Sequence, residues 1–289
     1  MLVLFIFRAG ERMYPIIESE RLNKEVVRMV IEAPDVARKI QPGQFIILRI
    51  DEEGERIPLT MNDYDAQAGT VTIIFQIVGA TTMKLSQMKA GDTLLDFVGP
   101  LGNPTPFEDA KHICVIGGGL GTAIAYSQAK WLYDHDYDVD VIIGFRNKDL
   151  IILEDEVKAH SNESIVMTDD GSNGNEGNVC VPLNKWLEEG KRWDLILVIG
   201  PPIMMKFASL ATKPYGIKTL VSMNPIMIDG TGMCGGCRVK VGDEYKHACI
   251  DGPDFDGHLV DYDEAMRRGV MYRSFESQAR DFFEEKGAN

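Results

Sequence analysis

The sequence predicts an antiparallel β-barrel, followed by an α/β domain with a parallel sheet and a small cysteine-rich C-terminal segment. Three observations predict this fold class. Short β-rich runs separated by turns fill roughly the first hundred residues, apolar strands then alternate with helices, and three cysteines crowd into residues 234–249. At 289 residues the chain is longer than one average domain, so two or three modules are expected.

The barrel is expected within residues 1–103. Turn residues such as Pro42, Gly43 and Gly69 separate runs rich in β-branched and aromatic side chains. The expected strands are residues 26–31, 45–50, 70–78 and 93–98. Their regular spacing is typical of an antiparallel barrel.

After the Gly- and Pro-rich stretch at residues 99–104 the pattern changes, so a second domain is expected at residues 104–223. Its expected strands are residues 112–116, 139–144, 164–168 and 195–199, with helices at residues 122–134 and 154–160. Strands that alternate with helices in this way predict a parallel sheet covered by helices.

The third expected segment, residues 224–289, contains the clustered cysteines and ends in an amphipathic stretch. Apolar residues at roughly helical spacing predict one closing helix over residues 263–286. They are Met266, Val270, Phe275, Ala279 and Phe282.

Composition excludes several classes of protein. The formal net charge of −14 and the lack of a basic stripe make a nucleic-acid partner unexpected. The apolar run at residues 1–7 is far shorter than the roughly 20 residues that a membrane span needs, and it lacks the basic flank of a secretion signal. We therefore expect a cytoplasmic protein without a membrane segment, whose translation starts at Met1 or at Met13.

The cysteine cluster indicates a metal centre. Two residues separate Cys234 from Cys237, and eleven residues separate Cys237 from Cys249. Plant-type 2Fe-2S sites have the spacing C-x4-C-x2-C with a distant fourth cysteine, and here Asp229 stands where the first cysteine would be. A carboxylate carries the charge of a thiolate but is a harder donor, so a cluster held by Asp229 and the three cysteines is expected.

Two other interpretations of the cluster remain open. One is a zinc site with His247 as the fourth ligand, and the other is an unliganded Cys-x-x-Cys redox pair. The remaining cysteines, Cys114 and Cys180, have apolar neighbours and are expected to be buried, inert thiols.

Nucleotide-binding signals follow the expected strands of the second domain. A glycine-rich turn after the first strand comprises Gly117, Gly118, Gly119, Gly121 and Thr122, and it precedes a helix whose N-terminus suits a phosphate. Arg146, and Gly200 with Pro201, follow later strands. Asp169 and Asp170 would repel a 2′-phosphate and accept hydrogen bonds from a 2′-hydroxyl, which favours NAD over NADP, although a solvated turn explains them equally well.

Two weaker signals for an anionic ligand lie in the barrel. Arg56 can pair with a pyrophosphate, and the turn of Gly79, Thr81 and Thr82 offers N–H groups and hydroxyls. Each alone is also explained by an ordinary surface arginine or helix cap.

Taken in order, these segments resemble the ferredoxin-NADP reductase superfamily over nearly the whole chain. The stretch from Asp229 to Cys237, with Cys249 and residues 250–261 behind it, is similar to the small subunits of NADH-dependent reduced ferredoxin:NADP oxidoreductases, also known as sulfide dehydrogenases. The electron-transfer subunits of dihydroorotate dehydrogenase B are similar too, but they usually have cysteine where this chain has Asp229.

The resemblance implies an oxidoreductase subunit with FAD, NAD(H) and a 2Fe-2S cluster. It implies a larger partner subunit with a second FAD and 4Fe-4S clusters, through which ferredoxin and NADP(H) take part in electron bifurcation. It places NAD(H) on the glycine-rich turn, and FAD on Arg56, Pro58, Leu59 and Thr60, with Gly79, Thr81 and Thr82 at its phosphates. No catalytic acid, base or nucleophile is expected, because the cofactors supply the chemistry. A non-catalytic, NAD-sensing zinc module is the alternative from another class.

Overall fold

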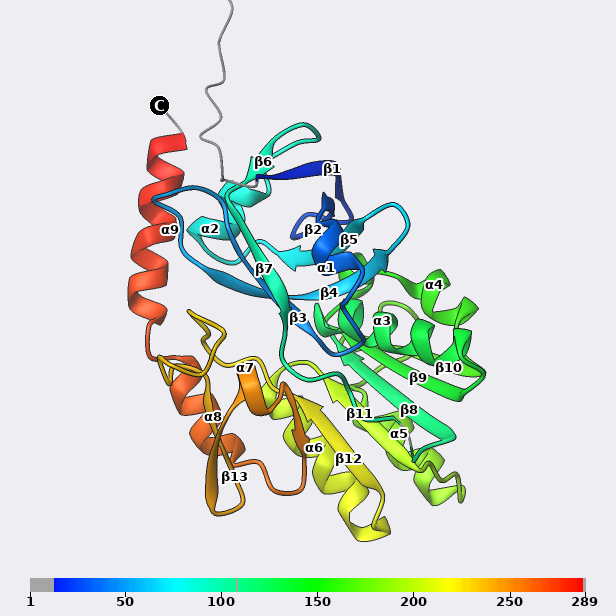
Figure 1. Cartoon of the computed structure of the whole chain (residues 1–289). Helices are drawn as coiled ribbons and strands as arrows, with labels where there is room; N and C mark the ends of the chain where they lie inside the picture. The colour runs from blue at the N-terminus through cyan, green and yellow to red at the C-terminus, as the bar shows by residue number, and fades with distance from the viewer. Residues whose placement is uncertain (1–12, 108, 288–289) are drawn as a thin grey trace, which may run out of the picture.

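A computed structural model describes residues 13–107 and 109–287 of the chain (Figure 1). The choice between Met1 and Met13 as the start falls on residues 1–12 and lies outside the described residues. Within the described part, no helix has the length and apolar character needed to cross a membrane.

The N-terminal part is a nearly closed antiparallel barrel, as predicted. Its sheet has the strand order β6-β1-β2-β5-β4-β3-β7. Two short helices, α1 (Pro34–Ala37) and α2 (Ala80–Leu85), join its strands. The strands are β1 (Tyr14–Arg21), β2 (Val26–Glu32), β3 (Phe45–Arg49), β4 (Ile57–Asp65), β5 (Thr70–Gln76), β6 (Thr93–Leu94) and β7 (Asp96–Leu101).

The barrel is filled by apolar side chains that its strands turn inward. Met29, Ile46, Ile73 and Phe75 are fully buried there. The single strand expected at residues 93–98 is wrong, because the chain changes partner at Leu95. The Leu95 N–H points to the carbonyls of Arg49 and Ile50, so β6 pairs with β1 and β7 pairs with β3.

The second sheet has the order β10-β9-β8-β11-β12-β15, and all its pairs are parallel except β12 with β15. The strand order reverses between β8 and β11, and ligands of such sheets bind at this reversal, beyond the carboxyl ends of the strands. The strands are β8 (His112–Gly118), β9 (Asp138–Phe145), β10 (Glu163–Thr168), β11 (Leu195–Ile199), β12 (Lys218–Ser222) and β15 (Asp254–Asp256).

Helices cover the parallel sheet, which confirms the predicted α/β arrangement (Figure 1). Most buried strand residues, such as Val115, Ile142 and Leu197, are apolar, as expected of a sheet covered on both faces. The connections are α3 (Gly121–Asp134), η1 (Lys148–Leu150), α4 (Glu154–Ala159), α5 (Cys180–Glu188), α6 (Pro202–Thr212) and η2 (Lys213–Tyr215).

The C-terminal segment folds back on both sheets. Its elements are β13 (Arg238–Val241), β14 (Glu244–His247), α7 (Ala248–Asp251), β15, α8 (Tyr262–Gly269) and α9 (Arg273–Gly287). The one closing helix expected over residues 263–286 is wrong, since Gly269 ends α8 and Val270 leaves helical geometry before α9 begins. Helix α9 lies beside α2 of the barrel (Figure 1).

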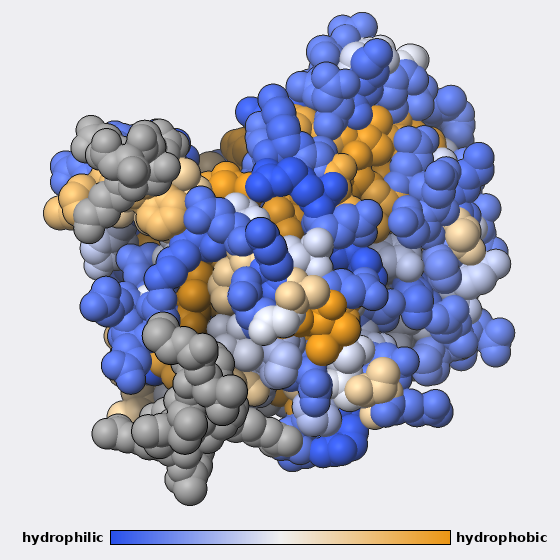
Figure 2. Space-filling view, turned by 90° about the horizontal axis from the view of Figure 1, so that it is seen from above, coloured by the Kyte–Doolittle hydropathy of each residue, from blue (hydrophilic) through white to orange (hydrophobic). Residues whose placement is uncertain are grey.

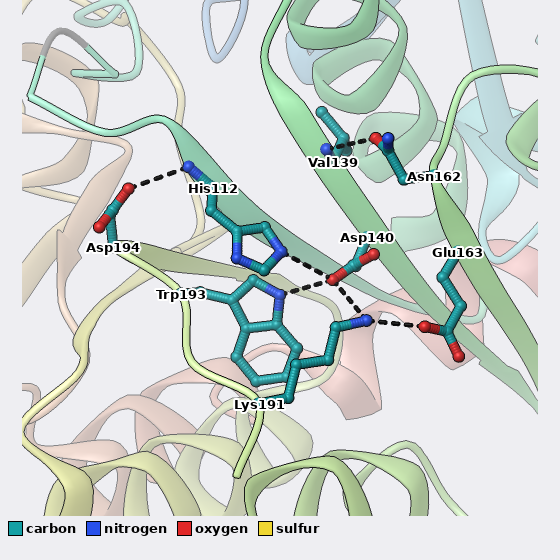
Figure 3. A network of polar contacts seen from close by, with 8 residues as sticks. All are labelled: His112, Val139, Asp140, Asn162, Glu163, Lys191, Trp193 and Asp194. Carbon is teal, nitrogen blue, oxygen red and sulfur yellow. Dashed lines mark hydrogen bonds and ion pairs between the residues drawn. The ribbon is translucent and has the colours of Figure 1, made fainter.

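A buried carboxylate joins the strands at the edge of the parallel sheet opposite the ligand-binding edge. Asp140 is 2% exposed and lies on β9. It accepts a hydrogen bond from the Trp193 indole at 2.8 Å, contacts His112 Nε2 at 3.0 Å and pairs with Lys191 Nζ at 2.8 Å (Figure 3). The pKa of Lys191 is raised, because hydrogen bonds to Asp140 and Glu163 outweigh the opposing effect of burial.

Asp140→Ala should lower the free energy of unfolding by about 3 kcal/mol, because it leaves the Trp193 N–H and the Lys191 ammonium without their shared acceptor. Urea unfolding measures the loss. Glu163→Gln removes the exposed carboxylate from the same lysine and should cost less than about 1 kcal/mol. Equal losses in the two variants would contradict the role given to Asp140.

Candidate functional site

A long cleft of about 1310 Å³ separates the barrel from the carboxyl edge of the parallel sheet. It is larger than the roughly 300–1,000 Å³ of typical small-molecule sites. Its lining is mostly apolar, including Phe45, Ile124, Phe207 and Met223. Figure 2 shows hydrophobic side chains gathered in a hollow with a hydrophilic rim. A cleft of this size has room for more than one nucleotide cofactor.

The barrel contributes the beginning of β4 to the cleft. Pro58, Leu59 and Thr60 line it, and all three are partly exposed. β4 pairs with β3 so that Thr60 lies opposite Phe45, which also lines the cleft. These three predicted residues therefore form one continuous wall.

The N-terminal end of α2 and the residues before it also reach the cleft, through Thr82 and Val78. Thr82 Oγ1 accepts hydrogen bonds from the N–H groups of Val78 at 2.9 Å and Gly79 at 3.0 Å, which caps the helix. Thr81 lies on the same turn, but its hydroxyl donates to Glu55 at 2.7 Å. Neither Gly79 nor Thr81 belongs to the lining.

The glycine-rich turn joins β8 to α3 at the reversal of strand order. Gly119 has φ +56° and open space where a side chain would begin, so its backbone is accessible to a ligand. Gly118 and Gly121 also line the cleft. Gly117 lies behind them, where a Cβ would meet Thr122 and Ala125 at 2.9 Å. Thr122 is fully buried, and its hydroxyl has no partner among the described residues.

Other strand ends complete this side of the cleft. Arg146 lies on the rim with its guanidinium 3.7 Å from Glu25, and Gly200 and Pro201 follow β11. Asp169 lines the cleft after β10. Asp170 does not line the cleft and is exposed, and hydrogen bonds from Ser172 lower its pKa.

Two features of the site differ from expectation. The structure does not bring Arg56 into the cleft, since its guanidinium donates to the carbonyl of Ile228 at 2.8 Å. Cys180 is not buried as expected but half-buried, and it lines the cleft at the start of α5; the partial burial raises its pKa. Cys114 is fully buried, as predicted.

The sequence analysis did not predict the part of the cleft lining at the end of β12. Ser222, Met223 and Asn224 line the cleft there. Residues 217–223 mix apolar with polar side chains, so the sequence gives only a weak strand signal there, and residues just after a parallel strand face the ligand. Pro253 of the C-terminal segment also lines the cleft, and no local pattern marks it.

The cysteine loop begins immediately beyond the cleft, whose lining extends to Met227. The Sγ atoms of Cys237 and Cys249 lie 3.2 Å apart and are buried, too far apart for a disulfide but suited to ligands of one metal atom. Cys234 is exposed at the tip of the loop. Asp229 accepts hydrogen bonds from the N–H groups of Thr231 at 2.8 Å and Cys234 at 2.9 Å.

Two candidate ligands of the loop have shifted pKa values. Burial, aided by the neighbouring Cys237, raises the pKa of Cys249 to about 12. The pKa of Asp229 is lowered, chiefly by the hydrogen bond from the Thr231 N–H. Metal binding requires thiolates, so loading of the loop releases protons and is favoured at higher pH.

The four predicted ligands form two separate pairs and not a single coordination sphere around one ion. Cys237 lies against Cys249, while the Asp229 carboxylate binds the backbone of Cys234. Among the described residues, no three Cys, His, Asp or Glu side chains converge on one point suited to a single ion. The backbone N–H of His247 donates to the Asp251 carboxylate at 2.7 Å, and the imidazole Nδ1 of His247 lies 4.0 Å from the same carboxylate.

Comparisons with known proteins agree with this geometry. Residues 224–261 match the family described as the iron-sulfur cluster binding domain of dihydroorotate dehydrogenase B. A dihydroorotate dehydrogenase B (NAD(+)) electron transfer subunit homolog of Thermotoga maritima is 42% identical, over 92% of this chain and 94% of that protein. An uncharacterized protein in the adh 3′ region of Clostridium beijerinckii is 51% identical over 93% of both chains.

Among solved structures, that of an NADH-dependent reduced ferredoxin-NADP oxidoreductase, reported for flavin-based electron bifurcation, superposes with a TM-score of 0.88. The identity is 38%, over 96% of this chain and 99% of the other. This similarity spans the barrel, the parallel sheet and the cysteine loop together.

The fold and the site define an electron-transfer subunit of an oxidoreductase, built on the ferredoxin-NADP reductase plan. The chain belongs to the family of dihydroorotate dehydrogenase B electron-transfer subunits and their homologues. FAD, NAD(H) and a 2Fe-2S cluster are the cofactors that this fold and family support, and a subunit of this kind works with a larger catalytic partner.

Proposed function

We propose that the chain passes electrons between NAD(H), FAD and a 2Fe-2S cluster within a heterodimeric, electron-bifurcating NADH-dependent ferredoxin:NADP oxidoreductase. The main support for this proposal is that the cleft lies directly next to the cysteine loop. The lining runs from the glycine-rich turn past Thr60 to Met227, two residues before Asp229. Such continuity suits electron transfer, whereas a nucleotide sensor does not need a metal centre beside its nucleotide.

The chain's own residues bind and orient the cofactors. Pro58, Leu59 and Thr60 form the wall for the flavin, and the turn at Thr82 faces its phosphates. The open backbone at Gly119 receives the nicotinamide nucleotide. Bound together, the cofactors supply hydride transfer between nicotinamide and flavin and single-electron exchange with the cluster. The apolar lining excludes water from the reacting rings, and no side chain has to act as acid, base or nucleophile.

The paired ligands suit a two-iron cluster, in which each iron takes two protein ligands. Cys237 and Cys249 would hold one iron, and Asp229 with Cys234 the other. A tetrahedral zinc site would need four donors around one ion. The two-pair arrangement therefore favours a 2Fe-2S cluster over a zinc site with His247.

The partner in this proposal is a larger subunit with a second FAD and 4Fe-4S clusters, through which ferredoxin and NADP(H) exchange electrons. The 38% identical bifurcating structure supports this partner. A dihydroorotate-oxidising partner is the second candidate, because several relatives at 30–33% identity are dihydroorotate dehydrogenase B subunits. Asp229 favours the first candidate, and co-purification of the native complex distinguishes the two.

Protein purified with its partner should show flavin bands with a broad sulfur-to-iron shoulder, and it should contain about two irons per copy of this chain beyond those of the partner. It should also reduce an artificial dye with NADH. Absorption spectra, iron analysis and a dye assay test this. Colourless protein that contains zinc and lacks dye reductase activity would show a structural or sensing module instead.

Asp229→Ala should lower the iron content of this chain below about two and change the electron paramagnetic resonance spectrum of the reduced cluster, because one iron loses a ligand. Asp229→Cys should retain the iron, since a thiolate suits the site. Asp243→Asn removes an exposed carboxylate from the β13–β14 turn and serves as the control. An Asp229→Ala protein with unchanged iron and spectrum would place the fourth ligand elsewhere.

Asp169→Asn should raise kcat/KM for NADPH relative to NADH by at least about tenfold, because it removes a carboxylate expected to repel the 2′-phosphate. Dye reduction with each nucleotide measures the ratio. Asp149→Asn removes an exposed carboxylate near the cleft that does not line it, and should leave the ratio unchanged. An unchanged ratio in Asp169→Asn would mean that other residues select NAD(H).

A further inference from the structure

Arg56 connects the barrel to the cysteine loop. It directly precedes β4, whose next four residues line the cleft. Its Nε donates to the Ile228 carbonyl at 2.8 Å, one residue before Asp229, and its Nη1 lies 3.6 Å from Asp96. The Nε of Arg49 forms an ion pair with the same Asp96 oxygen at 2.7 Å. Two guanidinium groups thus share one carboxylate, so these three groups together carry a net positive charge.

A second arginine reaches the loop from the opposite side. Arg268 lies in the last turn of α8 and donates from Nη2 to the Gly236 carbonyl at 3.0 Å, one residue before Cys237. Its Nε is buried and has no partner among the described residues. The two arginines therefore bind loop carbonyls on either side of Cys234, each next to a proposed ligand.

The loop depends on outside contacts for its shape. Gly230, Gly232 and Gly235 all have positive φ, so the backbone is intrinsically free and costs entropy to order. At Gly230 the backbone packs directly on the barrel, because a Cβ there would lie 2.7 Å from Leu101 and 2.8 Å from Ile47. The guanidinium groups fix the two ends with charge-assisted hydrogen bonds, which are stronger than neutral ones.

We propose that Arg56 and Arg268 are positioning residues that hold the two ends of the cysteine loop and raise the reduction potential of the cluster bound there. This inference rests on the proposed function. Reduction adds one negative charge to the cluster, and a nearby positive charge stabilises the reduced form more than the oxidised form. Since Arg56 also adjoins the flavin wall, its contact fixes the loop relative to the flavin site.

The test is a redox titration of the assembled heterodimer, followed by electron paramagnetic resonance of the 2Fe-2S signal. Arg56→Gln and Arg268→Gln should each shift the ratio of reduced to oxidised cluster about tenfold toward the oxidised form at a fixed potential, which is about 59 mV for one electron. The g-values should change as well. Arg56→Lys and Arg268→Lys keep the charge and one donor, and should restore most of the potential.

Matched controls separate contact with the loop from loss of charge alone. Arg49→Gln removes a charge from the same Asp96 pair without touching the loop, and Arg267→Gln removes an exposed neighbour of Arg268. Both should shift the ratio less than about threefold. Hydrogen exchange at residues 228–236 should rise in the Arg56 and Arg268 variants only.

The inference is overturned if Arg56→Gln and Arg268→Gln keep the wild-type potential, including the case in which they lose iron while the remaining clusters titrate normally. It is also overturned if the control variants shift the potential equally. A wild-type heterodimer without a 2Fe-2S signal would instead refute the proposed function. Wild-type protein with a normal signal and unshifted variants would refute only the role of the two arginines.

Discussion

Gly121 packs so closely against β11 that a Cβ there would lie 2.4 Å from the Ile199 carbonyl oxygen. This approach of α3 to the neighbouring strand is possible only without a side chain, and it occurs where the strand order reverses. It keeps the turn at Gly119 open toward the cleft. The side of the cleft lined by Gly118, Gly119 and Gly121 depends on this close packing.

The C-terminal segment needs support from both sheets because it has little core of its own. β15 pairs with β12, which brings Pro253 into the cleft. Thr105 donates to the partly buried Asp254 at 2.5 Å, and burial raises the pKa of this carboxyl group. Asn103 binds the Ile250 carbonyl at 3.0 Å. The cysteine loop is thus anchored near the point where the chain leaves the barrel.

Much of the fold could be predicted because each pattern arises from local physics. The strand at Leu195–Ile199 was predicted with its observed bounds, since a short, wholly apolar run fits a strand buried on both faces. The closing helix was wrong because its apolar spacing continues across Gly269, although the backbone does not. The spacing of apolar side chains indicates which face of a helix is apolar, but it does not indicate where the helix ends.

The sequence by itself determined the residue types at the site: a glycine-rich turn after a strand, polar residues at strand ends, and three cysteines in register with Asp229. These follow from spacing along the chain, which local geometry converts directly into structure. Only the tertiary structure decided which of them meet. In the tertiary structure Arg56 donates to the Ile228 carbonyl, 172 residues away, and Arg268 donates to the Gly236 carbonyl. Cys180 and Pro253 line the cleft. Such contacts depend on how separately formed layers pack, and no local pattern encodes that packing.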